Sequence, residues 1–407
     1  MVQYISMNQV EIINQFFEGE NLEFDFVGEK TRLIENLNWL KQLDVTEATF
    51  YKKWEEIQSC KSMYNQAASV KPLIWRPTDI NDEKLTIQEI EQLNPTIIPV
   101  GSDNPDWMTV RIFCHTAEFN QSPGRYMKFI VTDGNNNTFG EVPKYLGFIA
   151  VASDVITIKC RDEYIGWTNS HRVKDKLIGH SAVGTCVAPT QPFGYNFLGG
   201  KLIAALTVSK TVRDRWQELY SELLVGMSVT SLYGSFSQYT NLKWWHDCGK
   251  SAGKILLKPD EKHYKIWHEW LKKNQSEKYE KAMTQKEGIS GPVTSPKLRI
   301  LSMIFDVVDL KLKNYVHGFA RGVFYSMFYE NGREFFQNKI KQDQLKLKKL
   351  YQDDMNAIME YWKPRAISRY RKLKAEGKLK PDVLFYSDMI GMPYEEAKKQ
   401  FLSEVGR

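Results

Sequence analysis

The stretch from Gly184 to Val229 constrains the fold of this chain most. A short β-branched run, Thr185–Val187, leads into a loop with three glycines, which is followed by the apolar helical pattern Leu202–Trp216 and a second strand pattern, Leu223–Val229. A strand that passes through a tight loop into a helix and then into another strand is the repeating unit of α/β sheets. The sequence therefore predicts an α/β fold.

The loop of this unit, Gln191–Lys201, is a candidate anion site. The first N–H groups of a helix have no partner within the helix, so a diphosphate is favoured at the start of the helix that follows. The spacing is not that of a Walker A loop, because Leu202 follows Lys201, nor that of a GxGxxG dinucleotide loop. Alternatively, the glycines only permit a tight turn. The candidate cofactor-binding residues are Gln191, Gly194, Asn196, Gly199, Gly200 and Lys201.

The chain divides by pattern into four parts. Apolar residues at helical spacing predict an N-terminal helical cap at 1–70, and five prolines between Lys71 and Asp106 predict a linker at 71–106. An α/β domain is expected at 107–258 and a helical, basic domain at 259–407. The expected strands are Val110–Phe113, Met127–Thr132, Tyr145–Ala150, Val155–Lys159, Thr185–Val187 and Leu223–Val229.

Charge, cysteine use and hydropathy restrict the class of protein. The net charge of +6 over 407 residues is too small for a polycation, so contact with nucleic acid requires a local patch. The five cysteines form no CxxC pair, and we expect a reducing cytoplasm. We expect neither a signal peptide nor a membrane span. His263 and His268 miss the spacing of an HExxH pair, so no metal site is expected.

Several motifs resemble known families. The loop Gln191–Gly194, with Gly199 and Gly200 further on, is similar to the acyl-CoA loop of the GNAT superfamily of N-acetyltransferases. The segments Leu146–Asp154 and Arg161–Trp167 resemble the DruA-type proteins of the Druantia anti-phage systems, and more distantly the phage Mom-type enzymes that modify adenine in DNA. The resemblance covers roughly Arg111 to Gly253. It implies a GNAT-like mixed sheet flanked by N-terminal and C-terminal helical regions, and a CoA-type or other nucleotide-linked donor.

Four residues are candidates for proton transfer. His115, which corresponds loosely to a histidine of the Mom-type domain, and Asp162 could each accept a proton, and Tyr239 or Tyr233 could donate one to a leaving group. Each has a structural alternative: a hydrogen-bonded histidine, an ion pair between Arg161 and Asp162, and a packing aromatic ring.

Two groups of residues are candidates for DNA contact. Trp167 and Trp245, with Trp244, could hold an extruded base, although core packing is the alternative for each. The C-terminal segment interleaves basic and aromatic residues, which suits a phosphate backbone, but a solvated helix face has the same charges. Its candidate residues are Lys363, Arg365, Arg369, Arg371 and Lys372.

These observations lead to two hypotheses of function. The first is a DNA-modifying group transferase of Mom-like type, phage-encoded or linked to host–virus conflict, with DNA as its partner. The alternative is a non-catalytic DNA-binding protein of a phage defence or counter-defence system. The sequence leaves the oligomeric state, the donor and the acceptor base open.

Overall fold

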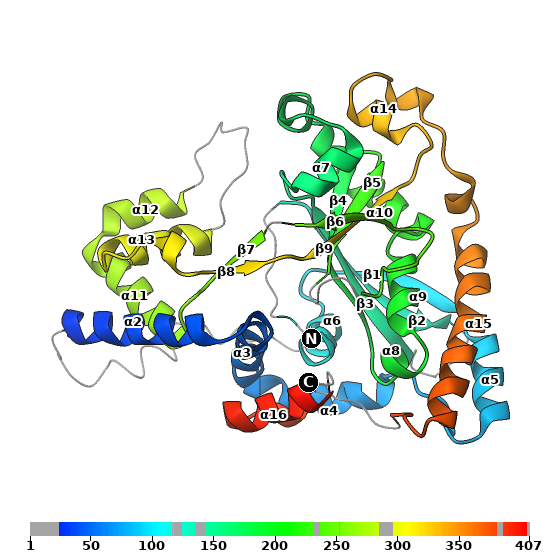
Figure 1. Ribbon diagram of the computed structural model, residues 1–407, viewed down its shortest axis with the longest axis horizontal. Helices are drawn as coiled ribbons and strands as arrows, with labels where there is room; N and C mark the ends of the chain where they lie inside the picture. Colours follow the sequence, from blue (N-terminus) through cyan, green and yellow to red (C-terminus); the bar gives the residue numbers. More distant parts are fainter. Residues whose placement is uncertain are drawn as a thin grey trace, which may run out of the picture.

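A seven-stranded mixed sheet forms the centre of the computed structural model, which describes residues 24–115, 117, 124–134, 144–231, 237–251, 253–284, 296–380 and 386–404 (Figure 1). The strand order is β1-β2-β3-β4-β5-β9-β6, and β7 and β8 form a separate two-stranded ribbon. The strands are β1 (Pro95–Val100), β2 (Tyr126–Asp133), β3 (Lys144–Ser153), β4 (Ser181–Pro189), β5 (Gly226–Thr230), β6 (His246–Lys250), β7 (Gly253–Leu256), β8 (Val316–Phe319) and β9 (Gly322–Met327). This architecture confirms the predicted α/β class.

Helices cover the sheet and extend beyond it. On the N-terminal side they are α2 (Phe26–Gln42), α3 (Val45–Gln58), α4 (Tyr64–Val70), α5 (Glu83–Gln92) and α6 (Pro105–Cys114). Between the strands lie α7 (Lys159–Ile165), α8 (Phe193–Asn196), α9 (Gly199–Leu206) and α10 (Lys210–Tyr220). The remaining helices are α11 (Glu261–Asn274), α12 (Ser276–Met283), α13 (Pro296–Val307), α14 (Gly332–Phe336), α15 (Asp354–Ala375) and α16 (Tyr394–Glu404). Within the described residues, none of these helices has the length and apolarity needed to cross a membrane.

The sheet is buried on both faces. Along β2, Phe129 joins one core cluster with α9 and α15, whereas its neighbour Ile130 joins a second cluster with α3 and α6. Successive side chains of a strand point to opposite faces, so β2 and β3 require apolar residues at nearly every position. In β2 the buried residues Met127, Phe129, Ile130 and Val131 meet this requirement, whereas Lys128, Thr132 and Asp133 are buried polar residues.

One parallel pair interrupts the antiparallel pairing of the described strands. Strands β1 to β4 pair antiparallel, β4 and β5 pair parallel, and β5, β9 and β6 again pair antiparallel. The parallel pair is the product of the crossover through α9 and α10. These two helices replace the single helix expected at Leu202–Trp216, because the chain leaves the helical conformation near Ser209, the N-cap of α10.

The predicted linker at 71–106 instead contributes to the sheet. Residues 95–100 form the edge strand β1, where Pro95 and Pro99 are tolerated because an edge strand needs hydrogen bonds on one side only. The expected strand Val110–Phe113 was also wrong. It lies in α6, whose start is fixed by the side chain of Asn104, which accepts a hydrogen bond from Trp107 N at 2.8 Å. The expected strand at Val155–Lys159 is absent from the described structure, and Lys159 begins α7.

The region expected to be helical from residue 259 onwards contributes both to a helical cluster and to the central sheet. Helices α11 and α13 pack with α2 around Trp267, at the far end of the ribbon β7/β8 (Figure 1). Strand β9, in contrast, lies between β5 and β6 in the central sheet. The residues after 258 are therefore part of the α/β fold as well as of the helical region.

Candidate functional site

A cleft opens where β4 separates from β5. The two strands pair only from Ser181↔Gly226 to Gly184↔Val229, and a bulge in β4 leaves Thr185 out of the backbone register with β3, to which it donates through its hydroxyl (Ala150 O, 3.3 Å). A bulge bends its strand and increases the local twist, which turns the rest of β4 away from β5. Beyond the bulge, the edge of β4 that faces β5 is contacted by the side chain of Gln238, whose Nε2 donates to Val187 O at 2.7 Å.

The cleft is the mouth of a cavity of about 1100 Å³. Six of the candidate residues line it, although they come from three separate segments of the chain: His115, Gln191, Gly194, Gly200, Lys201 and Tyr239. The opposite wall is formed by α3 and by the ends of the ribbon β7/β8, through residues such as Lys52, Lys258 and Arg321. The structure thus brings the proposed acid, base and anion loop to one cavity.

His115 lies at the C-terminal end of α6, next to the cavity. Burial, and then the positive charges of Arg111 and Lys53, lower the pKa of His115 to about 4. The imidazole is therefore neutral at pH 7. Its Nδ1 lies 3.1 Å from Ala117 O and 3.3 Å from Ala117 N, so Nε2 is the proton acceptor in the tautomer whose Nδ1 donates to Ala117 O.

A buried ion cluster lies behind His115 and fixes α6 to α3. The Lys53 ammonium donates to Glu56 Oε2 at 2.8 Å and to the carbonyl of Ile112, and Arg111 Nη2 donates to Glu56 Oε1 at 2.6 Å. Burial alone would raise the pKa of Glu56, but the charges of Lys53 and Arg111 lower it to about 2. One carboxylate therefore balances two cations, and the excess positive charge disfavours protonation of His115.

Tyr239 lies across the cavity, with 6% of its surface exposed. Its hydroxyl accepts a hydrogen bond from Gln238 Nε2 at 3.1 Å, and its ring packs edge-on against Trp245. Burial raises the pKa of Tyr239, so the hydroxyl keeps its proton at neutral pH. The alternative candidate Tyr233 lies outside the described residues.

The glycine loop is tightly packed. A Cβ on Gly194 would lie 2.6 Å from Gln191 Nε2, and one on Gly199 would lie 2.4 Å from the ring of Phe193. A Cβ on Gly200 would meet Gln238 Oε1 at 2.7 Å, at the floor of the cleft. Packing therefore accounts for Gly199, which lies outside the cavity lining, whereas Gly194 and Gly200 border the cavity.

Two polar residues of this loop are already engaged by the protein. Asn196 is fully buried and exchanges two hydrogen bonds with the backbone of Lys380, at 2.7 and 3.1 Å. Lys201 donates to Thr240 O at 2.6 Å. Burial, and then the charge of Arg365, lower the pKa of Lys201.

Asp162 lies away from the cavity, in a buried network. Its Oδ1 accepts from Arg161 Nη2 at 2.7 Å and from Trp167 Nε1 at 2.8 Å, and its Oδ2 lies 3.2 Å from Arg172 Nη1. Arg161 also binds Asp154, a carboxylate with no exposed side-chain surface. This arrangement matches the ion-pair alternative for Asp162.

Trp167 and Trp245 lie in the protein core. Trp167 packs edge-on against Phe336, and Trp245 Nε1 donates to Ala204 O at 2.9 Å. Their exposed fractions are 5% and 6%. Both indoles are thus used by the fold in the way that the packing alternative predicts.

The basic residues of α15 lie on a helix that packs against α5 and α9. Arg371 pairs with Glu83 at 3.1 Å, Lys372 lies 3.9 Å from Glu376, and Lys363 Nζ donates to Glu91 O at 2.5 Å. Arg365 Nη1 donates to Tyr361 O at 2.8 Å, and its guanidinium carbon lies 3.7 Å from the centre of the Tyr361 ring.

Arg369 connects α15 to the cleft through Tyr195, which lines the cavity. Arg369 Nε donates to Tyr195 O at 3.4 Å, and its guanidinium carbon lies 5.2 Å from the centre of the tyrosine ring. Through Arg369, α15 therefore places a positive charge next to Tyr195 in the cavity lining.

Sequence reasoning missed the residues that reach the cavity from distant elements. Gln238 bridges the gap to β4, and Lys52, Lys258 and Arg321 line the far wall. No local pattern marks them, because their partners are far away in the sequence. Among the described residues, no group of three or more His, Cys, Asp or Glu side chains could hold a metal ion.

Comparisons with known proteins agree on one family. The model of the family described as "Druantia protein DruA" matches residues 53–338, which include every strand of the central sheet. Druantia protein DruA of Escherichia coli (strain UMEA 4076-1) is 29% identical over 132 residues, a segment that covers 30% of this chain and 30% of that protein. No solved structure matches the chain.

Proposed function

Because the chain belongs to the family of Druantia protein DruA, we propose that it acts in anti-phage defence as a group transferase that modifies bases of DNA. The opening between β4 and β5 supports this proposal most strongly. It creates a cavity of about 1100 Å³ next to the glycine loop, with a neutral histidine and a protonated tyrosine in its walls. A large cavity on which polar groups with shifted pKa values converge is typical of a catalytic site.

The residues around the loop fit the diphosphate of a CoA-type donor. Gly194 and Gly200 border the cavity, where the side chains of Gln191 and Gln238 lie against them and would be the first groups that a ligand at the loop meets. The first turn of α9 presents N–H groups at this point, and Lys201 adds a positive charge. A donor of this type supplies an activated acyl group.

The chain's own residues would move the protons. His115, neutral at pH 7, would take the proton from the acceptor nitrogen as the new bond to the acyl carbon forms. Tyr239 would give its hydroxyl proton to the leaving group as the bond to the acyl carbon breaks. The buried cluster of Lys53, Glu56 and Arg111 would keep His115 in the unprotonated form.

The basic residues of α15 would hold the DNA. Arg365 and Arg369 lie near Lys201 and Tyr195, respectively, at the rim of the cleft. Phosphates bound there would place a nearby base at the cavity, whereas the buried Trp167 and Trp245 would support the fold.

Mass spectrometry of nucleosides tests the proposal. DNA from bacterial cells that express the chain should contain a nucleoside of new mass, which is lost in His115→Gln and Tyr239→Phe variants. The matched control is His171→Gln, since His171 lies outside the cavity lining. Unmodified nucleosides in DNA from both plain and phage-infected expressing cells would refute the transferase.

The second candidate is a DNA-binding protein without catalysis. The burial of Trp167 and Trp245 favours it, because neither ring is available to hold an extruded base. A binding protein should show salt-dependent affinity for DNA and no thermal shift with acyl-CoA compounds. A thermal shift with acyl-CoA that Gly200→Asp abolishes would argue against this candidate.

A further inference from the structure

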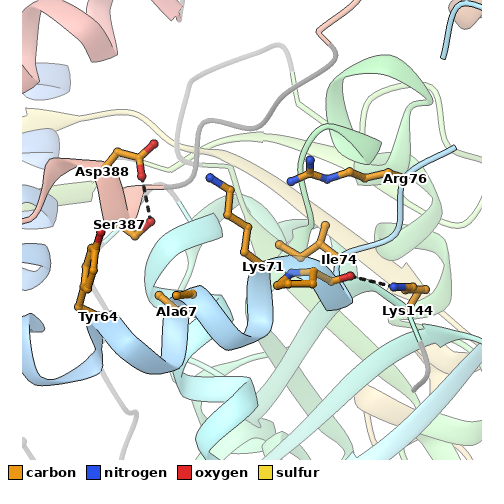
Figure 2. A pocket seen from close by; sticks show the side chains of 10 residues that line it. Tyr64, Ala67, Lys71, Ile74, Arg76, Lys144, Ser387 and Asp388 are labelled. Carbon is orange, nitrogen blue, oxygen red and sulfur yellow. Dashed lines mark hydrogen bonds between the residues drawn. The ribbon is translucent and has the colours of Figure 1, made fainter. Parts of the chain in front are cut away.

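A second cavity lies away from the cleft and shares no lining residue with it. Its volume is about 560 Å³. It is an open pocket bordered by α4, the short helix η2 (Lys71–Leu73), the start of β3 and the short helix η9 (Tyr386–Met389), as Figure 2 shows.

Two of its walls are fixed by the core. Beside η2, Ile74 pairs with Tyr145 of β3, and Trp75 N donates to Tyr145 O at 3.0 Å. On the other side, Gln58 Nε2 donates to Met389 O at 2.7 Å, which anchors η9 to α3. The pocket is therefore formed before any ligand arrives, so binding orders little of the chain.

One end of the pocket is cationic. Arg76 and Lys144 lie at this end, and the side chain of Lys71 extends into the space between it and the opposite wall (Figure 2). Lys144 uses one of its three N–H donors on Pro72 O at 2.8 Å. Three cationic side chains around one pocket favour an anion with several acceptor oxygens, such as a phosphate.

The opposite end has different chemistry. It carries the carboxylate of Asp388, the hydroxyl of Ser387 and the ring of Tyr64, which is 55% exposed (Figure 2). Ser387 Oγ donates to Asp388 Oδ1 at 3.3 Å. A carboxylate repels a phosphate but accepts hydrogen bonds from hydroxyl or amine groups, and an exposed tyrosine ring can stack on a planar base.

We propose that this pocket binds a nucleotide with a terminal phosphate. The phosphate lies among Lys71, Arg76 and Lys144, and the sugar hydroxyls or exocyclic amine donate to Asp388. Tyr64 stacks on the base. Inorganic phosphate would contact only the cationic end, and a nucleoside would contact only the end with Asp388 and Tyr64. A ligand therefore needs both a phosphate and a nucleoside to fill the pocket. The volume lies within the range of about 300–1,000 Å³ found for small-molecule sites.

Isothermal titration calorimetry of the full chain tests the proposal, with AMP, adenosine and inorganic phosphate as probes. AMP should bind at least about tenfold more tightly than either fragment. Lys71→Glu and Arg76→Glu should each weaken AMP binding about tenfold or more, because each removes a charge-assisted hydrogen bond and adds repulsion. Asp388→Asn should weaken AMP but not phosphate.

The control variants separate this site from other effects. Lys265→Glu, an equal charge reversal at an exposed position of α11, should leave AMP binding unchanged. Gly200→Asp, in the cleft, should also leave it unchanged, so failure of the transferase proposal does not affect this one. Equal affinity for AMP and phosphate, or no binding of AMP by the folded protein at millimolar concentration, would overturn the proposal.

A final comparison identifies the source of the nucleotide. A free nucleotide is the ligand if AMP competes fully with a 5′-phosphorylated oligonucleotide and binds as tightly. A nucleic-acid end is the source if the oligonucleotide binds more tightly and Lys71→Glu weakens both. Both results support recognition of a terminal nucleotide phosphate, whereas an oligonucleotide that binds equally well with and without its 5′ phosphate contradicts it.

Discussion

Asp162→Asn should destabilise the fold strongly, because Asp162 is the centre of a buried ion network. The carboxylate accepts two hydrogen bonds from Arg161, at 2.7 and 3.0 Å, one from Trp167 and one from Ile158 N at 3.1 Å. An asparagine keeps one carbonyl oxygen and turns an NH₂ group toward the donors on the other side. The side chains of Arg161 and Arg172 have exposed fractions of 0% and 8%, so water cannot replace the lost oxygen.

The expected cost follows from this geometry. Two buried donors lose their acceptor, at about 1–3 kcal/mol each, and the buried guanidinium groups lose a counter-charge. Breaking a buried ion pair by removing one partner costs about 3–5 kcal/mol. We therefore expect the free energy of unfolding to fall by about 3–5 kcal/mol.

Urea denaturation followed by tryptophan fluorescence measures this change. Glu163→Gln is the matched control, because Glu163 is adjacent, mostly exposed and 3.9 Å from an exposed lysine; it should change the unfolding free energy by less than about 0.5 kcal/mol. If Asp162→Asn is as stable as the parent but has lost DNA modification, Asp162 is a catalytic residue and this reasoning is refuted.

Further variants test the cleft and its surroundings. Glu56→Gln should lower the unfolding free energy by about 3–5 kcal/mol in thermal denaturation, since two buried cations lose their counter-charge; an unchanged midpoint would contradict the cluster. The pKa of His115 is about 4 in the folded protein, against 6.5 for an ordinary histidine. As the pH falls, the unfolded chain therefore binds a proton at this residue before the folded protein does. The free energy of unfolding should decrease between pH 6.5 and pH 4. In His115→Gln, the decrease in unfolding free energy between pH 7 and pH 4.5 should be smaller by up to about 3 kcal/mol, as measured by urea denaturation at the two pH values; equal pH dependence in both proteins would refute the depressed pKa. Tyr239→Phe should reduce nucleoside modification about 100-fold or more with little change in melting temperature, and equal yield would exclude it as the acid. Arg365→Ala should lower the slope of log affinity for duplex DNA against log salt by about 0.9; an unchanged slope would place the phosphates elsewhere.

The strands that could be predicted from the sequence are those with strong local signals. Buried runs of β-branched and aromatic residues identified β2, β3 and the end of β4, and the glycine loop marked the start of α9. The run Val110–Phe113 has the same composition but lies in α6. There the N-cap at Asn104 and the proline at the first helical position override the β preference of the side chains.

The cavity could be predicted only in part, because half of its wall comes from distant segments. The loop Gln191–Lys201 and the residues His115 and Tyr239 carry chemistry that can be recognised locally. Lys52 and Arg321 do not: their position depends on the packing of α3 and of the ribbon β7/β8 across the cleft. Likewise, Asp162 and its neighbour Glu163 have similar chemistry in the sequence, and only the fold shows that one is buried and the other exposed.

The position of β9 between β5 and β6 has a consequence for synthesis on the ribosome. Strand β5 ends at residue 230, and its neighbour β9 begins at residue 322. At about 5–20 residues per second, the edge of β5 waits roughly 5–20 s for its partner. During this interval an apolar strand edge is open to pairing with other chains. A fragment that ends near residue 258 should therefore aggregate, although it contains the whole predicted α/β domain, and the helical arm at 259–315 is made while the sheet is still incomplete.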